Sequence, residues 1–273
     1  MSQVIVSGSF DDFRSAQVRF LQEAAAIGSV HVRLWSDKAV NDLEGRPAKF
    51  PESERAYFLE ALRYVDRVTV CDGSAGPDAL SAEYLDPSTV WVVDPAHDTE
   101  AKRAFCRSNG IDYRAFSADQ LQGFPEDSSG PAESSSSRKK VIVTGCYDWF
   151  HSGHIRFFEE VSELGDLYVV VGHDANIKLL KGEGHPMFCQ QERRYMVGAI
   201  RYVCQALVSS GNGWLDAEPE IERIRPDIYA VNEDGDRPEK SSFCESHGIQ
   251  YKVLHRTPKE GLPRRESTHL RGF

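Results

Sequence analysis

Short apolar runs alternate with stretches of helical periodicity along the chain. In the second half, the apolar runs predict strands at 140–144, 167–172, 205–209, 227–231 and 250–254. The first run is rich in β-branched residues, as a buried parallel strand is. After it, Phe157, Phe158, Val161 and Leu164 recur at helical spacing, which predicts a helix with one apolar face. Alternating strands and helices of this kind predict an α/β fold with a doubly wound parallel sheet.

The two halves of the chain are repeats of one another. Gly8, Asp11, Phe13, Arg63 and Phe105 match Gly145, Asp148, Phe150, Arg201 and Phe243, at an offset of 137 or 138 positions. A constant offset over this length predicts tandem domains of one fold, at 1–124 and 139–273. The segment 125–138 is rich in serine and carries proline, glycine and acidic residues, so it predicts a flexible linker.

The most informative stretch lies where the first strand of the second half ends. Gly145 breaks this strand, and His151-Ser-Gly-His154 then opens the following helix. A helix N-terminus offers N–H groups without an intrahelical acceptor and a partial positive charge, and two imidazoles there add further donors. Gly153 leaves room for a large anion to approach the backbone. The pattern favours a phosphate-binding site.

This strand–Gly–x–Tyr–Asp–x–Phe–His–x–Gly–His segment resembles the signature of the HxGH nucleotidyltransferase superfamily, most closely its cytidylyltransferase branch. The resemblance implies two tandem Rossmann-like nucleotidyltransferase domains. It also implies transfer of CMP from CTP to a phosphorylated alcohol, such as phosphoethanolamine or glycerol 3-phosphate, with release of pyrophosphate. Mg²⁺ would accompany the triphosphate with few protein ligands, and Asp148 would either orient the motif or approach the metal.

The resemblance implies roles for residues throughout the second half. The implied catalytic residues are His151, His154 and Lys181. The implied nucleotide-binding residues are Gly145, Tyr147, Asp148, Gly153, Lys178, Arg201, Asn232, Asp234, Arg256, Ser267 and Thr268. The two lysines fall in what we expect to be a glycine-rich loop. Trp214 is the implied substrate residue, with core packing as the competing interpretation.

Several positions depart from the family's pattern or have a possible structural role. Asn232-Glu-Asp234 replaces a Gly-Asp-Asp-like turn, and extra residues separate Arg256-Thr257 from Ser267-Thr268. Arg193 has a counterpart, Arg55, in the first half, which favours a structural role for it. Arg201 likewise has the counterpart Arg63, so a partly structural role is the alternative for Arg201.

The first half lacks the histidine motif. Arg14-Ser-Ala-Gln17 stands where the second half has His151-Ser-Gly-His154, so both imidazoles and the glycine are missing. We therefore expect a degenerate domain that does not perform the chemistry. The alternative is a repurposed binding site that uses Arg14. We also expect the two domains to pack as an intramolecular pseudo-dimer, and a homodimer is compatible with the sequence.

Composition limits the classes of partner. The formal net charge of −10 argues against nucleic acid, although a small phosphorylated ligand needs only a local basic pocket. We find no apolar run of membrane-spanning length and no signal peptide, so the sequence predicts a cytoplasmic protein. Its six cysteines form no CxxC pair, which favours buried free thiols in a reducing compartment over a zinc site or disulfides.

Two other functions remain open at this stage. Ser267-Thr268-x-x-Arg271 also resembles adenylyltransferase endings, so ATP is an alternative donor. A non-catalytic nucleotide-binding or scaffold protein, built from two weakened copies, is the alternative from another class.

Overall fold

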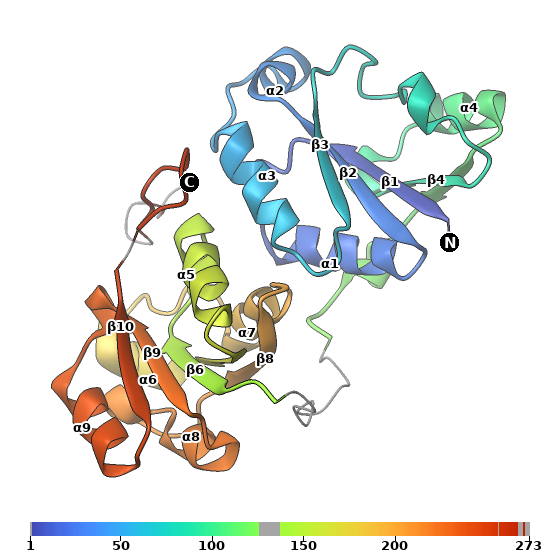
Figure 1. Cartoon of the computed structure of the whole chain (residues 1–273). Helices are drawn as coiled ribbons and strands as arrows, with labels where there is room; N and C mark the ends of the chain where they lie inside the picture. The colour runs from blue at the N-terminus through green and yellow to red at the C-terminus, as the bar shows by residue number, and fades with distance from the viewer. Residues whose placement is uncertain (1, 126–136, 256, 267–269, 271–273) are drawn as a thin grey trace. The chain divides into compact units, whose positions relative to one another are not determined.

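The computed structural model describes residues 2–125, 137–255, 257–266 and 270. The chain divides into two compact units, Met1–Gly123 and Phe124–Phe273. Each unit contains one five-stranded parallel sheet with helices between its strands (Figure 1). The predicted fold class, a tandem pair of doubly wound α/β sheets, is confirmed.

In the first unit the sheet has the order β3-β2-β1-β4-β5. Its strands are β1 (Gln3–Gly8), β2 (Ser29–Trp35), β3 (Arg67–Cys71), β4 (Thr89–Val93) and β5 (Asp112–Ala115). Its α-helices are α1 (Ser15–Ala25), α2 (Asp37–Glu44), α3 (Glu52–Glu60) and α4 (Glu100–Asn109), and short 3-10 helices are η1 (Ala82–Tyr84), η2 (Pro95–His97) and η3 (Asp119–Leu121).

The second unit repeats this order as β10-β9-β6-β7-β8. Its strands are β6 (Lys140–Gly145), β7 (Asp166–Val171), β8 (Val203–Val208), β9 (Ile228–Asn232) and β10 (Gln250–Leu254). Its α-helices are α5 (Ser152–Ser162), α6 (Asp174–Lys181), α7 (Gln190–Gly198), α8 (Glu218–Ile224) and α9 (Pro238–Ser246), and short 3-10 helices are η4 (Gly213–Leu215) and η5 (Glu233–Gly235). The five predicted strands are thus confirmed, with ends shifted by at most two residues.

The order of the strands makes β6 and β9, which pair directly, the point at which the direction of the chain across the sheet reverses. Parallel crossovers are right-handed, so the helices that follow β6 and β7 cover one face of the sheet and those that follow β8 and β9 cover the other. The core agrees, since Ile142 and Tyr229 pack in one cluster with Ile221 of α8 and Phe243 of α9. Chain paths therefore diverge at the carboxyl ends of β6 and β9, where ligands bind in such folds.

The two units also share unusual backbone geometry. Phe10 and Tyr147 follow the first strand of their units and both have positive φ, at 46° and 55°. Gly28 and Gly165 likewise correspond, because a Cβ atom on either would lie 2.2 or 2.1 Å from the carbonyl oxygen of Ser2 or Lys139. The repeat seen in the sequence is thus a repeat of backbone structure.

One local prediction is wrong. We expected Lys178 and Lys181 in a glycine-rich loop, but both lie in α6. The His173 ring caps this helix by accepting the N–H of Asn176, and Ile177 is buried under it. The loop begins only at Gly182, which ends the helix with φ 84°.

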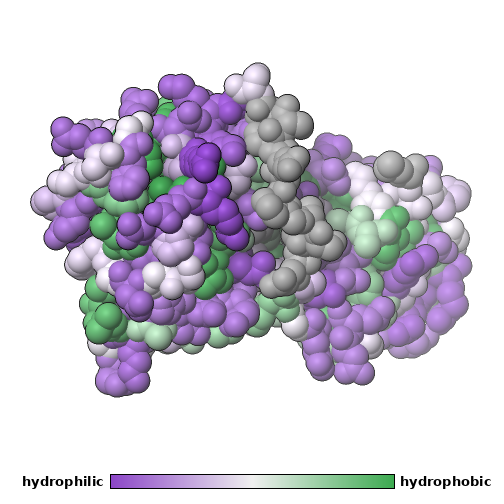
Figure 2. Space-filling view, turned by 90° about the horizontal axis from the view of Figure 1, so that it is seen from below, coloured by the Kyte–Doolittle hydropathy of each residue, from purple (hydrophilic) through white to green (hydrophobic). Residues whose placement is uncertain are grey.

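The surface is compatible with the acidic composition. On the face shown in Figure 2, most of the surface is hydrophilic, with apolar side chains in small separate groups. In the part of the chain that the structure describes, the exposed large apolar side chains are Val70, Leu179, Met187, Trp214 and Val253. All six cysteines are free, as predicted, but the prediction that they are buried holds only for Cys106 and Cys244, since Cys189 and Cys204 are exposed. No helix among the described residues is both long and apolar enough to cross a membrane.

Candidate active site

A strained turn connects β6 to the histidine motif. Tyr147 adopts the left-handed conformation and is buried, with its ring centroid 5.3 Å from those of both His154 and Phe158. The tyrosine ring folds back over Gly145, where a Cβ atom would lie 2.7 Å from it. A non-glycine residue with positive φ is costly, so the surrounding contacts must hold this turn in place. The predicted pair Gly145 and Tyr147 therefore shapes the start of the motif.

The two histidines of the motif are held by the backbone that they cap. His151 is the N-cap of α5, and its Nδ1 accepts the N–H of Gly153 at 3.1 Å. Nδ1 of His154 accepts the N–H of His151 at 3.3 Å, and the two rings stack with centroids 4.0 Å apart. Since Nδ1 is the acceptor in both rings, the neutral tautomer carries its proton on Nε2. Each imidazole thereby carries its donor on Nε2, and the Nε2 atom of His151 is buried.

Gly153 is needed for this arrangement. A Cβ atom at this position would lie 2.9 Å from Cε1 and 3.0 Å from Nδ1 of His151. The histidine ring could then no longer fold over the helix terminus. The glycine thus serves the orientation of His151.

Asp148 and Arg193 form the frame beneath the motif. Both oxygens of the buried Asp148 accept the backbone N–H of Met187, at 2.8 and 2.9 Å, and Oδ1 also accepts that of Phe188. The Arg193 guanidinium donates to the carbonyl oxygens of Cys146, Gly172 and Phe188 and pairs with Asp174 at 2.7 Å. These contacts join the strand ends to the loop before α7. They give Asp148 an orienting role and Arg193 the structural role that the repeat predicted.

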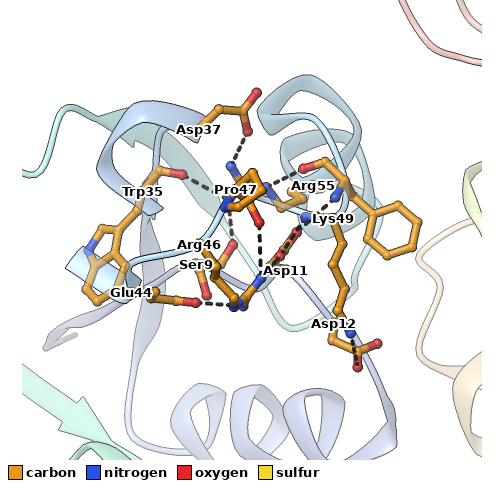
Figure 3. A network of polar contacts seen from close by, with 11 residues as sticks. Ser9, Asp11, Asp12, Trp35, Asp37, Glu44, Arg46, Pro47, Lys49 and Arg55 are labelled. Atoms are coloured by element: carbon orange, nitrogen blue, oxygen red, sulfur yellow. Dashed lines mark hydrogen bonds and ion pairs between the residues drawn. The ribbon is translucent and has the colours of Figure 1, made fainter. Parts of the chain in front are cut away.

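The first unit builds the same frame from corresponding residues (Figure 3). Asp11 accepts the backbone N–H of Lys49 and Phe50, and Arg55 donates to the carbonyl oxygens of Ser9, Trp35 and Phe50. Arg55 also pairs with Asp37 at 2.7 Å. What differs is the helix start, where the side-chain oxygen of Gln17 accepts the N–H of Arg14 at 2.9 Å in place of the His154 imidazole. The frame is thus common to both units, and the imidazoles occur only in the second.

The C-terminal segment reaches the start of α5. Gly153 and Asn232, both predicted nucleotide contacts, line one small hollow with His255, Lys259 and Arg265. The hollow encloses about 20 Å³, much less than a nucleotide fills. Since Arg264 and Arg265 also line it, basic side chains gather here in a protein of acidic composition. Arg256, Ser267 and Thr268 lie outside the described residues.

Other predicted residues lie at varying distances from the motif. Lys178 is exposed and pairs with Glu183 at 3.0 Å. Burial raises the pKa of the Cys146 thiol, and the nearby charge of Lys181 partly offsets this rise. Asp234 lies in η5, the short helix that begins directly after Asn232.

Arg201 is not brought together with the histidines in this unit. It lies in the turn before β8, at the amino end of the strand, whereas Gly145 lies at the carboxyl end of β6. The predicted parallel strand at 205–209 already implied this position, because Arg201 precedes that strand, and only the family resemblance assigned Arg201 to the nucleotide.

Trp214 does not pack in the core. Its side chain is 47% exposed, and the Arg237 guanidinium lies 4.8 Å from its ring centroid. The turn that carries it is fixed by Asn176, whose amide both donates to and accepts from the backbone of Gly213. An exposed indole on a fixed turn is suited to contact a ligand.

Sequence reasoning missed one residue at this edge of the sheet. Lys240 of α9 is only 7% exposed, and its ammonium lies 3.3 Å from the hydroxyl oxygen of Thr144, next to Gly145. The repeat carried a signal for it, since Lys102 occupies the corresponding position in the first unit.

Comparison with known proteins places these residues in a family. Residues 142–249 match the family model described as "Cytidylyltransferase-like". A protein named FAD synthase from Methanocella paludicola is 31% identical over 135 residues, which are 48% of this chain and 93% of that protein. Another FAD synthase, from Ferroglobus placidus, is 37% identical over 97 residues, 35% of this chain and 60% of that protein. A "Bifunctional protein HldE" from Campylobacter concisus is 34% identical over 99 residues, 36% of this chain and only 20% of that protein. Through its second unit, the chain belongs to the cytidylyltransferase-like family of nucleotidyltransferases.

Proposed function

We propose that the second unit transfers an adenylyl group from ATP to a phosphorylated acceptor and releases pyrophosphate. The observation that carries this proposal is the stacked pair His151 and His154 at the start of α5. Its two Nε2–H donors and the helix N-terminus together favour a group with several anionic oxygens.

The relatives support ATP as the donor. FAD consists of FMN joined to AMP, so a protein named FAD synthase has a product that contains an adenylyl group. This favours the adenylyltransferase alternative of the sequence analysis over transfer from CTP. CTP with a phosphorylated alcohol is the second candidate, and the description of the matching family model favours it.

The chemistry that we propose is a direct in-line displacement. A phosphate oxygen of the acceptor attacks the α-phosphorus of ATP and forms a new P–O bond. The bond from the α-phosphorus to the bridging oxygen breaks, and its electron pair leaves with pyrophosphate. Since the acceptor oxygen is already ionised at neutral pH, no general base is needed, and the protein acts by positioning and by stabilising charge.

The histidines supply most of that stabilisation in our proposal. His151 and His154 donate from Nε2 to oxygens of the transferred and leaving phosphates. Loss of one such preorganised donor typically costs about 10²–10³-fold in turnover. Lys178, Lys181, Arg256, Ser267 and Thr268 are proposed to hold further phosphate oxygens, and Asn232 and Asp234 to contact the nucleoside.

We further propose that Mg²⁺ acts at this site as a companion of the triphosphate. No group of three or more His, Cys, Asp or Glu side chains in the described ranges is arranged to hold a metal ion. Asp148, the carboxylate of the motif, already accepts backbone N–H groups with both oxygens. Bound through phosphate oxygens, Mg²⁺ would neutralise charge on the triphosphate.

The test is pyrophosphate release from the purified chain with Mg²⁺. ATP and CTP are offered separately, each with FMN, glycerol 3-phosphate or phosphoethanolamine. We expect release with ATP and one acceptor. Release with CTP and an acceptor, but not with ATP, would favour the second candidate. Binding of ATP or CTP without release for any acceptor would favour the non-catalytic alternative and count against our proposal.

A further inference from the structure

Each unit buries a lysine at the same place. Lys240 is the third residue of α9 and Lys102 the third residue of α4, and they are 7% and 6% exposed. The ammonium of Lys240 lies 5.6 Å from the ring centroid of Tyr229, and that of Lys102 lies 6.0 Å from the ring centroid of Trp91. The two lysines are therefore equivalent in fold, and each can serve as a reference for the other.

The partners of the two lysines differ. Lys102 donates to the carbonyl oxygen of His97 at 2.8 Å and pairs with Asp78 at 3.4 Å. Lys240 has one hydrogen bond within the described ranges, a long one of 3.3 Å to Thr144 Oγ1. That hydroxyl is also bonded to Tyr229 at 2.7 Å. The first unit thus gives its buried lysine an ion-pair partner, whereas among the described residues of the second unit no carboxylate lies within ion-pair distance of Lys240.

A buried ammonium with one neutral partner is costly. An ammonium offers three N–H donors, and burying it without an anion is unfavourable. Burial lowers the pKa of Lys240, and the charges of Asp216, Asp234, Asp236 and Arg237 act on it only from beyond ion-pair distance, among the residues described. An anionic ligand would complete this site.

The position of Lys240 indicates which anion. Thr144 points to the sheet face covered by α8 and α9, because Ile142 and Tyr229 pack there and side chains alternate along a strand. His151 and His154 begin α5, on the other face. The carboxyl ends of β6 and β9, where the chain paths diverge, lie between these faces. In an in-line displacement the attacking oxygen and the leaving group lie on opposite sides of the phosphorus.

We propose that Lys240 and Thr144 form a subsite for the phosphate monoester of the acceptor, opposite the histidines. This inference rests on the proposed nucleotidyl transfer, in which the histidines hold the leaving side. The exposed Trp214 borders the subsite, because its ring contacts Arg237, the residue before α9, and η4 packs against α9. Its indole suits a planar or apolar acceptor body.

The experiment separates binding of the acceptor from binding of the nucleotide. The full chain is saturated with a non-hydrolysable ATP analogue and titrated calorimetrically with FMN and with glycerol 3-phosphate. We compare wild type, Lys240→Met, Lys240→Arg and the matched control Lys102→Met. We expect one monoester to bind wild type and the control equally, and to bind Lys240→Met at least tenfold more weakly, as for a lost charged hydrogen bond. Lys240→Arg should restore part of the loss.

The outcomes are distinguishable. Unchanged monoester binding in Lys240→Met would overturn the subsite, as would failure of both monoesters to bind the nucleotide-saturated wild type. An equal loss of affinity for the ATP analogue would also overturn it. Should Lys240→Met not fold, Thr144→Val must weaken binding of the monoester and leave binding of the ATP analogue unchanged. Failure of the proposed function looks different, because wild type would then release no pyrophosphate from ATP with any acceptor, whatever it binds.

Discussion

The imidazole of His154 stacks on that of His151 while its Nδ1 accepts the backbone N–H of the same residue. In the first unit, the Gln17 oxygen accepts the backbone N–H of Arg14 in the same way. Both units thus keep the polar cap that begins the helix, and only the second keeps an aromatic donor at that place. The cap belongs to the fold, whereas the imidazole serves the chemistry that we propose.

His154→Ala should lower turnover by about 10²–10³-fold, because it removes one preorganised donor to the phosphates. It should also cost about 1 kcal/mol of stability, because the cap is lost. Steady-state rates of pyrophosphate release and unfolding curves measure the two effects.

Gln17→Ala is the matched control for this substitution. It removes the corresponding cap from the first unit, so stability should fall by a similar amount while turnover stays at the wild-type level. An equal loss of turnover in the two variants would mean that His154 acts only through stability.

Gly153→Ala should disturb the site without deleting a polar group. The new Cβ would lie 2.9 Å from Cε1 of His151, so the ring must turn away from the helix terminus. We expect turnover to fall at least tenfold. Ala16 occupies the equivalent position in the first unit, and Ala16→Gly should leave turnover unchanged. A crystal structure of Gly153→Ala with the His151 ring unmoved would contradict this explanation.

Arg193→Ala should destabilise the second unit by about 3–5 kcal/mol, because it leaves buried carbonyl oxygens without their donor. Arg55→Ala should do the same to the first unit, where the contacts are equivalent. Hydrogen–deuterium exchange, followed peptide by peptide, assigns each loss to its unit. Faster exchange in the second unit after Arg55→Ala, with the first unit unaffected, would be incompatible with this account.

The stability of the first unit should depend on pH through the carboxyl group of Asp11. Burial tends to raise the pKa of Asp11, but the N–H groups of Lys49 and Phe50 and the Arg46 guanidinium outweigh it and hold the pKa below 3.8. The folded pKa is thus lower than the unfolded one, so the carboxylate adds stability above pH 3.8 that is lost as the pH falls through the folded value.

Asp11→Asn tests this dependence. The variant should be less stable than wild type at pH 7, and the difference should narrow as the pH falls below 3.8. Denaturant midpoints at neutral and acidic pH measure it. A difference that is the same at both pH values would show that Asp11 contributes by shape alone.

Much of the fold could be predicted because it follows from local patterns. Neighbouring residues alone are enough to assign the strand before Gly145, from its β-branched run, and the helix after Ile155, from its apolar spacing. The repeat added long-range information, since Arg55 and Arg193 at equivalent positions indicated a structural role that both networks confirm.

The failures concern features that depend on three-dimensional placement. Lys178 and Lys181 were expected in a loop, because the glycines after them hid the helical packing of Ile177. Arg201 lies at the opposite edge of the sheet from Gly145, as the predicted strands at 140–144 and 205–209 already implied, but the family motif alone does not show it. Lys240 was missed because a lysine in a polar helix reads as exposed, although its counterpart Lys102 could have drawn attention to it.

The most direct test of nucleotidyl transfer follows the α-phosphate itself. The full chain is incubated with Mg²⁺, an acceptor from the panel and ATP labelled at the α-phosphorus, and the products are separated. We predict that the label moves to the acceptor in the wild-type chain and stays in ATP when His151 and His154 are both replaced by alanine. Label recovered only as ATP or free AMP for every acceptor, or equal transfer by the double variant, would contradict the function that we propose.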